Sequence, residues 1–161
     1  VPALLAMSSC FLMLKQTPKA RNQLKRIAKL PFNSGEADEF ERSWLLFAEI
    51  NMKDKKRFEE ARELCRKALK YNIACARAWE LLGQMAEMET NVEEAARSYE
   101  SSWRFSFESN PAVGYRLAKN YLKMKMFVHS IDVCKKVIKD HPDFPKIRQK
   151  ILNKARISIK P

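Results

Sequence analysis

The sequence contains little glycine, and this shortage excludes several classes of protein. Only Gly35, Gly83 and Gly114 occur among 161 residues. Sheet-rich folds and phosphate-binding loops need many backbone positions with positive φ, which glycine supplies at the least cost. The sequence also contains no glycine-rich phosphate loop, no GxSxG and no HExxH. It therefore predicts an all-helical chain that is not an enzyme and needs no cofactor.

Cysteine patterns for metal binding are missing as well. The four cysteines form no CxxC pair, and only His129 and His141 are available as nitrogen ligands. The cluster of ligand-type side chains between these histidines does not match the spacing of structural zinc sites. We therefore expect no metal site. Four unpaired thiols favour a reducing, cytoplasmic compartment.

The sequence also lacks a hydrophobic run long enough to cross a membrane. The most apolar stretch is Ala3 to Leu14, and twelve residues of helix rise only ~18 Å against a hydrocarbon core of ~30 Å. No basic segment precedes it, as one would in a signal peptide. We expect this stretch to be a buried core helix. Because the chain opens on Val1 rather than Met, we also expect a fragment of a longer protein.

Acidic residues are absent from the first 35 positions, and charge is unevenly distributed after them. Residues 1–35 carry six Lys/Arg, residues 36–110 carry twelve against sixteen Asp/Glu, and residues 111–161 carry thirteen against three. The three zones have net charges of +6, −4 and +10, which give the total of +12. A strongly basic end predicts attraction to an acidic partner, or a solvated face without a specific role.

Large and small side chains recur at an interval of 35 residues. Trp44, Trp79 and Gly114 occupy one column of this repeat, and a second column consists of small residues. That column contains Ala48, Gly83 and Ala118. Small residues at a fixed place in each unit let paired helices approach closely, and large residues then fill the gaps between pairs. The pattern is similar to the tetratricopeptide repeat and predicts an α-solenoid of antiparallel helix pairs with a C-terminal capping helix.

Breakers and caps divide this pattern into units. We predict helices over 2–15, 18–29, 37–52, 57–71, 74–89, 92–105, 111–124, 128–140 and 145–158. We interpret residues 1–30 as a degenerate helix pair and 31–40 as a linker with the start of the first full repeat. The repeats then cover 41–75, 76–110 and 111–145, and 146–161 form the capping helix and tail. Asn110 and Pro111 are expected as N-cap and first helical residue of the third repeat.

Several stretches resemble one family more specifically, over essentially the whole chain. They are 14–18 (LKQTP), 20–29 (ARNQLKRIAK), 43–50 (SWLLFAEI), 109–115 (SNPAVGY) and 141–148 (HPDFPKIR). Together they look like the C-terminal end of the tetratricopeptide repeat protein 21 family. The resemblance implies a non-enzymatic scaffold in intraflagellar transport complex A, which acts in retrograde ciliary transport and ciliary membrane-protein trafficking, with a place in the cytoplasm, the cilium and the ciliary base. Asn51 departs from the pattern, because the family favours an aromatic there.

Two surfaces are candidates for binding other protein subunits. The first follows from the repeat type, whose first helices line a concave groove that takes a peptide or helix. Its residues are Arg42, Leu45, Glu49, Met52, Arg77, Glu80, Gln84, Glu87, Tyr115, Lys119 and Leu122. The second is a basic C-terminal face, expected to dock on an acidic face of another subunit. Its residues are Lys135, Lys136, Lys139, Lys146, Arg148, Lys150, Lys154 and Arg156.

Other ligands fit this sequence less well. Only Arg116 falls on a position used by chaperone-binding repeats to grip a C-terminal carboxylate, so such a clamp is not expected. The alternative function is an RNA-binding helical-repeat module, since pentatricopeptide repeats share the period and a basic surface. Those modules read one base per unit and use many units. Three units with tryptophans as packing residues favour protein over nucleic acid.

Overall fold

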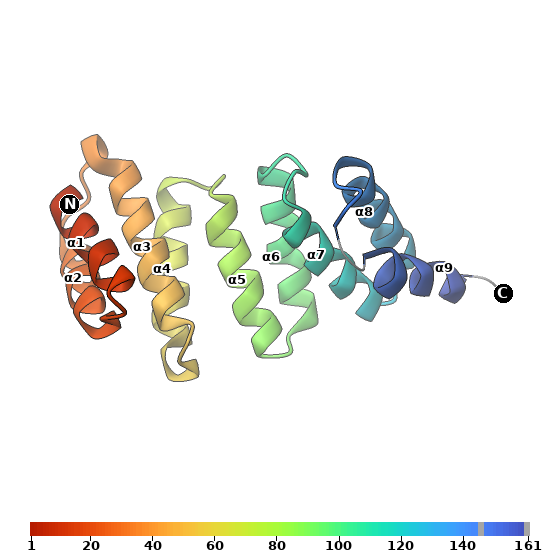
Figure 1. Ribbon diagram of the computed structural model, residues 1–161, viewed down its shortest axis with the longest axis horizontal. Helices are drawn as coiled ribbons and strands as arrows, with labels where there is room; N and C mark the ends of the chain where they lie inside the picture. Colours follow the sequence, from red (N-terminus) through yellow and green to blue (C-terminus); the bar gives the residue numbers. More distant parts are fainter. Residues whose placement is uncertain (145–146, 160–161) are drawn as a thin grey trace. The chain divides into compact units, whose positions relative to one another are not determined.

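The computed structural model describes residues 1–144 and 147–159, and in these ranges it contains α-helices and short helical turns but no strand. The nine α-helices found in these ranges belong to two compact units, Val1–Ile73 (unit 1) and Ala74–Pro161 (unit 2) (Figure 1). Successive helices pair within each unit. The all-α class, the helix pairs and the C-terminal capping helix are therefore confirmed.

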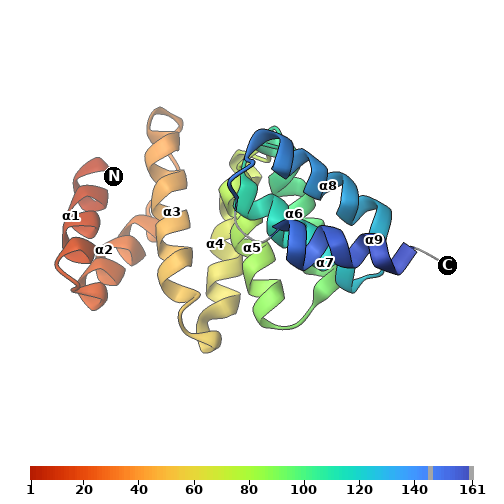
Figure 2. The ribbon, with the colours of Figure 1, turned by 45° about the vertical axis from the view of Figure 1, so that its right-hand side comes forward.

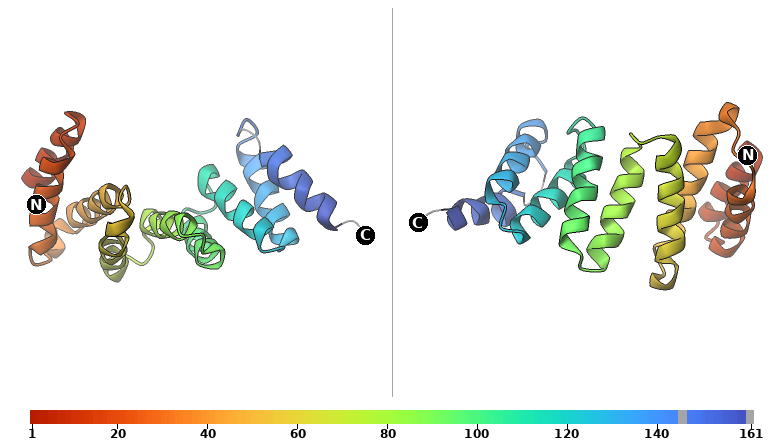
Figure 3. Two further views of the ribbon diagram at one scale, coloured as in Figure 1. Left: turned by 90° about the horizontal axis from the view of Figure 1, so that it is seen from below. Right: turned by 180° about the vertical axis from the view of Figure 1, so that it is seen from behind.

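Unit 1 consists of two helix pairs. The first pair is α1 (Pro2–Met13) with α2 (Thr17–Lys29), and the second is α3 (Ala37–Asn51) with α4 (Phe58–Tyr71). Short 3-10 turns, η1 (Ser34–Glu36) and η2 (Lys55–Arg57), precede α3 and α4. Helix α2 packs on α3 and joins the pairs, and the view from below in Figure 3 shows α3 and α4 side by side.

An aromatic cluster runs from the core of unit 1 to its surface, where Tyr71 is exposed. Trp44 is 1% exposed, and its ring lies 5.5 Å from Phe40 and 5.6 Å from Tyr71. Phe32, from the linker before α3, stacks on Tyr71 at 3.8 Å between ring centroids. Lys67 covers the cluster, with its Nζ 4.8 Å from the Trp44 ring and 3.0 Å from the Ala28 carbonyl oxygen. Trp44 is thus a packing residue, as the repeat pattern predicts.

The prediction that residues 3–14 form a buried core helix is wrong about burial. Helix α1 forms and all of its residues are described, but Ser8 alone is buried, and Met13 is 84% exposed. The physical reason is that α1 is apolar all round and packs mainly against α2, so most of its surface has no neighbour in the described residues. None of the described helices is long and apolar enough to span a bilayer.

Unit 2 begins with α5 (Ala76–Met88) and α6 (Val92–Phe105), followed by α7 (Pro111–Lys123) and α8 (Phe127–Asp140). The chain then returns through a π-helical turn, η3 (Arg148–Leu152), into α9 (Asn153–Ile159). Both η3 and α9 pack against α8, and η3 also touches α7 (Figure 2). The expected start of this last helix at Pro145 lies outside the described residues.

Side-chain caps fix where two helices of unit 2, α6 and α7, begin. The Asn110 side-chain oxygen accepts hydrogen bonds from the backbone N–H groups of Ala112 and Val113, at 3.1 and 3.4 Å. Asn91 accepts one from the Glu94 N–H at 3.2 Å. These oxygens satisfy N–H groups that lack a partner in the first turn of a helix. The predicted N-cap at Asn110 is therefore confirmed.

Small residues permit the close helix approaches that the repeat requires. Ala48, Gly83 and Ala118 are all buried. A Cβ atom on Gly83 would lie 2.8 Å from the Tyr99 ring of α6, and one on Gly114 would lie 2.5 Å from Val137 Cγ2 and 2.8 Å from Trp103 Cζ3. Gly114 occupies the column that holds Trp44 and Trp79 in the other two predicted repeats. Trp103 fills the space beside Gly114 instead.

Trp79 differs from its expected role as a buried packing residue, because it is only partly buried. The buried residues of α5 are Ala78, Leu81, Gly83, Met85 and Ala86. At about 100° per residue, Trp79 lies between Ala86 and Gly83 around the helix axis, so it is on the buried side of α5. The 35-residue interval therefore identifies the helix and its buried side correctly but overestimates how fully the tryptophan is covered.

Candidate partner-binding groove

The first wall of a surface groove in unit 2 comes from one stripe of α7. Tyr115, Lys119, Leu122 and Lys123 follow the spacing i, i+4, i+7 and i+8, so their side chains share one face of the helix. The opposite face of α7 is anchored in the core through Val113, which has no exposed surface. Burial of that face leaves the stripe directed outward.

The second wall comes from the returning chain. Lys150 and Ile151 belong to η3, and Lys154 follows on the first turn of α9. Ile151 is 2% exposed and packs into the core together with Ile147, Leu152 and Ala155. These four apolar residues are all buried, which leaves the lysines at 150 and 154 in solvent.

The two walls enclose a groove of about 400 Å³ with a distinct charge pattern. Its rim has four exposed ammonium groups, two from each wall, and the described residues that line it include no acidic side chain. Among the described residues, none of these four lysines forms an ion pair. The apolar part of the lining is Tyr115, Leu122 and Ile151. An unneutralised basic rim around an apolar floor suits a ligand that is both acidic and apolar.

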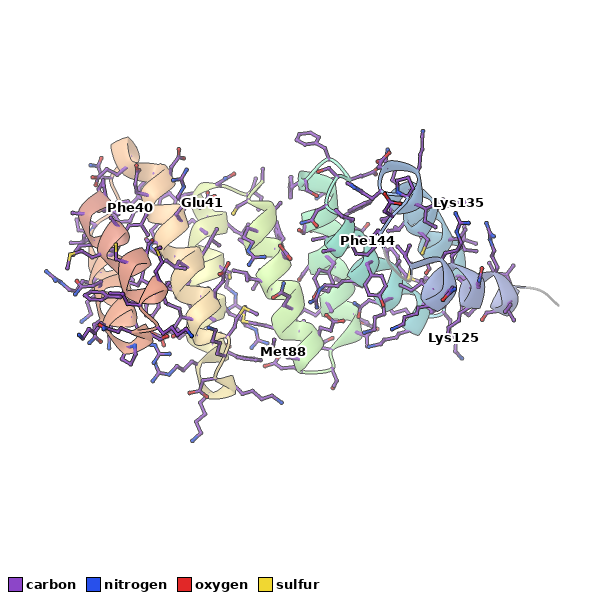
Figure 4. The ribbon with its side chains drawn as sticks, viewed as in Figure 1. Phe40, Glu41, Met88, Lys125, Lys135 and Phe144 are labelled. Carbon is purple, nitrogen blue, oxygen red and sulfur yellow. The ribbon has the colours of Figure 1, made fainter. Side chains whose placement is uncertain are left out.

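Neighbouring side chains hold the floor in place. The Tyr115 ring lies 6.0 Å from Phe144, which is labelled in Figure 4.

Arg116, the residue after Tyr115 on α7, points to a different partner and donates to the Glu87 carboxylate at 2.8 Å. Tyr99 donates to the same carboxylate at 2.8 Å. Burial, together with Glu87, raises the pKa of Tyr99, so its hydroxyl remains a donor at neutral pH.

The predicted concave-groove residues fall into three groups. Tyr115, Lys119 and Leu122 come together in the groove just described. On α3 and its C-cap, Leu45 and Met52 are 9% and 7% exposed and offer little surface, Arg42 is exposed, and Glu49 is half-buried.

On α5 the predicted residues bind one another or their neighbours. Arg77 donates to Glu80 at 2.7 Å, and Gln84 donates to Glu80 at 3.2 Å. Glu87 is occupied by Tyr99 and Arg116. A partner at this face would have to compete with these contacts.

The predicted basic C-terminal face is divided in the structure. Lys150 and Lys154 line the groove, whereas Lys136 pairs with Asp140 at 3.4 Å. Lys146 lies outside the described residues. The remaining members are exposed, and these are Lys135, Lys139, Arg148 and Arg156.

The sequence-based predictions kept the two candidate surfaces apart and missed that they meet. They also missed Lys123, although that residue lies one helical turn after Lys119 and the spacing was available as a signal. Lys123 ends α7 and Lys150 belongs to η3, and the whole of α8 lies between them in the sequence. Only the fold brings these two lysines to one groove.

The histidines and cysteines of unit 2 are not assembled into a site. In residues 1–144 and 147–159, no group of three or more His, Cys, Asp or Glu side chains is placed to hold a metal ion. His129 lies beside the Tyr121 ring, and His141 Nε2 lies 3.0 Å from the Ser109 carbonyl oxygen. Cys134 is fully buried, and burial raises the pKa of its thiol to about 12. Its environment favours an unreactive thiol in the core.

These features define a class of protein. Antiparallel helix pairs that stack through small residues, and that leave a charged groove on the outside, are typical of helical-repeat scaffolds that bind other proteins.

Comparison with known proteins identifies the family. Residues 1–156 match the family described as the tetratricopeptide repeat protein 21 C-terminal ARM domain, and the chain belongs to this family. It is 50% identical over 161 residues to tetratricopeptide repeat protein 21B of Homo sapiens, and 50% identical over the same length to tetratricopeptide repeat protein 21A of Mus musculus. The Caenorhabditis elegans homolog is 35% identical over 160 residues. These alignments cover 99–100% of this chain but only 12% of each relative.

Solved structures show the same fold at low sequence identity. The crystal structure of MamA protein superposes with a TM-score of 0.78 at 18% identity, covering 98% of this chain and 81% of that one. A structure of Naa15/Naa10 bound to HypK-THB gives a TM-score of 0.72 at 18% identity, covering 98% of this chain and 22% of that one. At these identities the likeness concerns the helical-repeat fold alone.

Proposed function

We propose that this chain is a non-catalytic, protein-binding segment of a subunit of intraflagellar transport complex A. Membership of the tetratricopeptide repeat protein 21 family supports this proposal, together with a fold that presents helix faces to possible partners. In this role the protein acts in retrograde ciliary transport and in the trafficking of ciliary membrane proteins. Its place is then the cytoplasm, the cilium and the ciliary base.

The groove of unit 2 is the docking surface in this proposal. The single observation that carries it is the meeting of two pairs of lysines, none of them in an ion pair among the described residues, over an apolar floor. Charges that remain unpaired in a subunit are available to steer and orient a partner of opposite charge. The partner would be another subunit of the same complex.

Co-purification of the full-length protein tests this function. The variant Lys150→Glu/Lys154→Glu reverses one wall of the groove. The control Lys53→Glu/Lys125→Glu makes the same change of charge at two exposed lysines that belong to neither candidate surface, and Lys125 is labelled in Figure 4. We expect the first variant to lose subunits of the complex and the control to retain them. Equal retention by both variants at physiological salt would contradict the proposal.

An RNA-binding function predicts a different result for the same two variants. Binding that depends on phosphates weakens steeply as salt increases and follows the number of cations rather than their position. Both charge-reversal variants would then lose RNA binding to a similar extent. A protein-docking groove predicts unequal losses.

A further inference from the structure

The chemistry of the groove narrows the kind of segment that it can hold. Lys119 and Lys123 stand one turn apart on one wall, and Lys150 and Lys154 stand one turn apart on the other. Lysines four residues apart project from the same side of a helix, so each wall presents two ammonium groups along one side of the groove. Two pairs of cations on facing walls call for a ligand with negative charge on both of its sides.

The floor adds a second requirement. Tyr115, Leu122 and Ile151 form the apolar lining between the two walls, and the Phe144 ring supports Tyr115. Ile151 is only 2% exposed, so the apolar surface that a ligand side chain can remove from water comes from the partly buried Tyr115 and Leu122. A volume of about 400 Å³ has room for one bulky side chain and its flanking residues.

From these two features we infer that the groove binds an acidic protein segment in which one bulky apolar side chain is flanked on both sides by carboxylates. This inference rests on the proposed function, because it names the chemistry of the segment that docks at the same groove.

The shape of the groove, rather than the type of its cations, favours a protein segment. All four rim cations are lysines, and the described part of the chain places no arginine in the lining. Lysine acts as a compact point charge that binds carboxylates and phosphates alike, so charge alone does not distinguish these ligands. The groove is also hollow with an apolar floor, while a lipid headgroup layer or a nucleic-acid backbone offers no apolar side chain to fill it. A protein segment supplies both the charge and the apolar group.

The π-helical turn lies at this site. Residues Arg148–Leu152 form η3, which contributes Lys150 and Ile151 to the groove. Turns of this kind inside α-helices occur frequently at functional sites. Within this turn, Lys150 contributes to the rim of the groove and the next residue, Ile151, contributes to its floor.

Peptide binding to the full-length protein tests the inference. The probe is a fluorescent peptide with one Leu between pairs of Glu, measured by fluorescence anisotropy. Two control peptides replace its Glu residues by Gln, or its Leu by Ser. We expect the probe to bind, each control peptide to bind about tenfold more weakly, and either wall variant, Lys119→Glu/Lys123→Glu or Lys150→Glu/Lys154→Glu, to weaken the probe by about tenfold or more. Lys53→Glu/Lys125→Glu should bind the probe as the unchanged protein does.

A charge swap separates loss of the site from loss of the fold. A peptide with Lys in place of Glu should bind poorly to the unchanged protein and should bind the variant in which all four groove lysines are Glu. This gain of binding requires a folded groove.

Three results would overturn the inference. They are equal binding of the Gln peptide, no gain in the charge swap, and binding of phosphoinositide-containing vesicles through these lysines without binding of the Glu peptide. If the wall variants still lose partner subunits in that case, the docking surface stands and only the chemistry of its ligand is wrong.

Discussion

Gly114→Ala tests the closest helix approach in unit 2. In an open helix this change stabilises by about 0.5–1 kcal/mol, because alanine has the better helix propensity. Here the new Cβ would lie 2.5 Å from Val137 Cγ2 and 2.8 Å from Trp103 Cζ3, whereas ordinary contact begins at 3.4 Å. Val137 and Trp103 are both buried, so neither can move away freely. Overpacking of this kind costs about 1–3 kcal/mol. We expect a net loss of about 0.5–2 kcal/mol.

The measurement is urea unfolding followed by far-UV circular dichroism, with hydrogen exchange of the α7 amides as a local reading. Gly35→Ala is the control, because the nearest neighbour of its Cβ would be the Asn33 side chain, at 3.4 Å. That change should stay within about 0.5 kcal/mol. In the double variant Gly114→Ala/Val137→Ala, removal of the valine methyl groups relieves the clash, so its cost should be smaller than the sum of the single costs. If Gly114→Ala stabilises the protein as it would in an open helix, the close approach of α7 to α8 is refuted.

Four further predictions concern polar side chains and cysteine thiols. Asn51→Leu should stabilise unit 1 by about 1–2 kcal/mol, because the Asn51 side chain is fully buried and its amide has no hydrogen-bond partner among the described residues; a lower urea midpoint would contradict this. Glu87→Gln should destabilise unit 2 by about 1 kcal/mol, since Arg116 loses its carboxylate, and added salt should reduce the difference. Burial raises the pKa of the Cys134 thiol from 9.0 to about 12. The free energy of unfolding that this shift contributes is therefore fully present below pH 9.0 and is lost as the pH rises toward about 12. Cys134→Ser should flatten this part of a plot of unfolding free energy against pH. In native labelling with iodoacetamide, exposed Cys10 should react while Cys134 stays protected.

Periodicity predicted the helices well because their packing is local. The small-residue column at Ala48, Gly83 and Ala118 and the apolar face of the last helix are both set by contacts with the adjacent helix. Such contacts leave a regular trace in the sequence. The division into repeats at 41–75, 76–110 and 111–145 stays a prediction, since helix bounds alone do not fix where one repeat ends.

Burial was harder to predict than helix position. The apolar composition of α1 suggested a core helix, yet burial depends on how many neighbours pack around it, and composition does not report that number. Trp79 shows the same difficulty on a finer scale, because it shares the side of α5 that buries Gly83 and Ala86 and is still only partly covered.

The last helix connects the stability of unit 2 with its proposed binding role. Ile151 lies in the core, and the exposed Lys150 and Lys154 on either side of it form one wall of the groove. Ile151→Ala should therefore cost about 2–5 kcal/mol and weaken partner binding as well, because the wall loses its support. Lys150→Glu/Lys154→Glu should weaken binding while leaving the urea midpoint nearly unchanged, since exposed charges contribute little to stability. If the lysine variant also unfolds the unit, the two roles are not separable and the groove is a structural feature of the cap rather than a docking site.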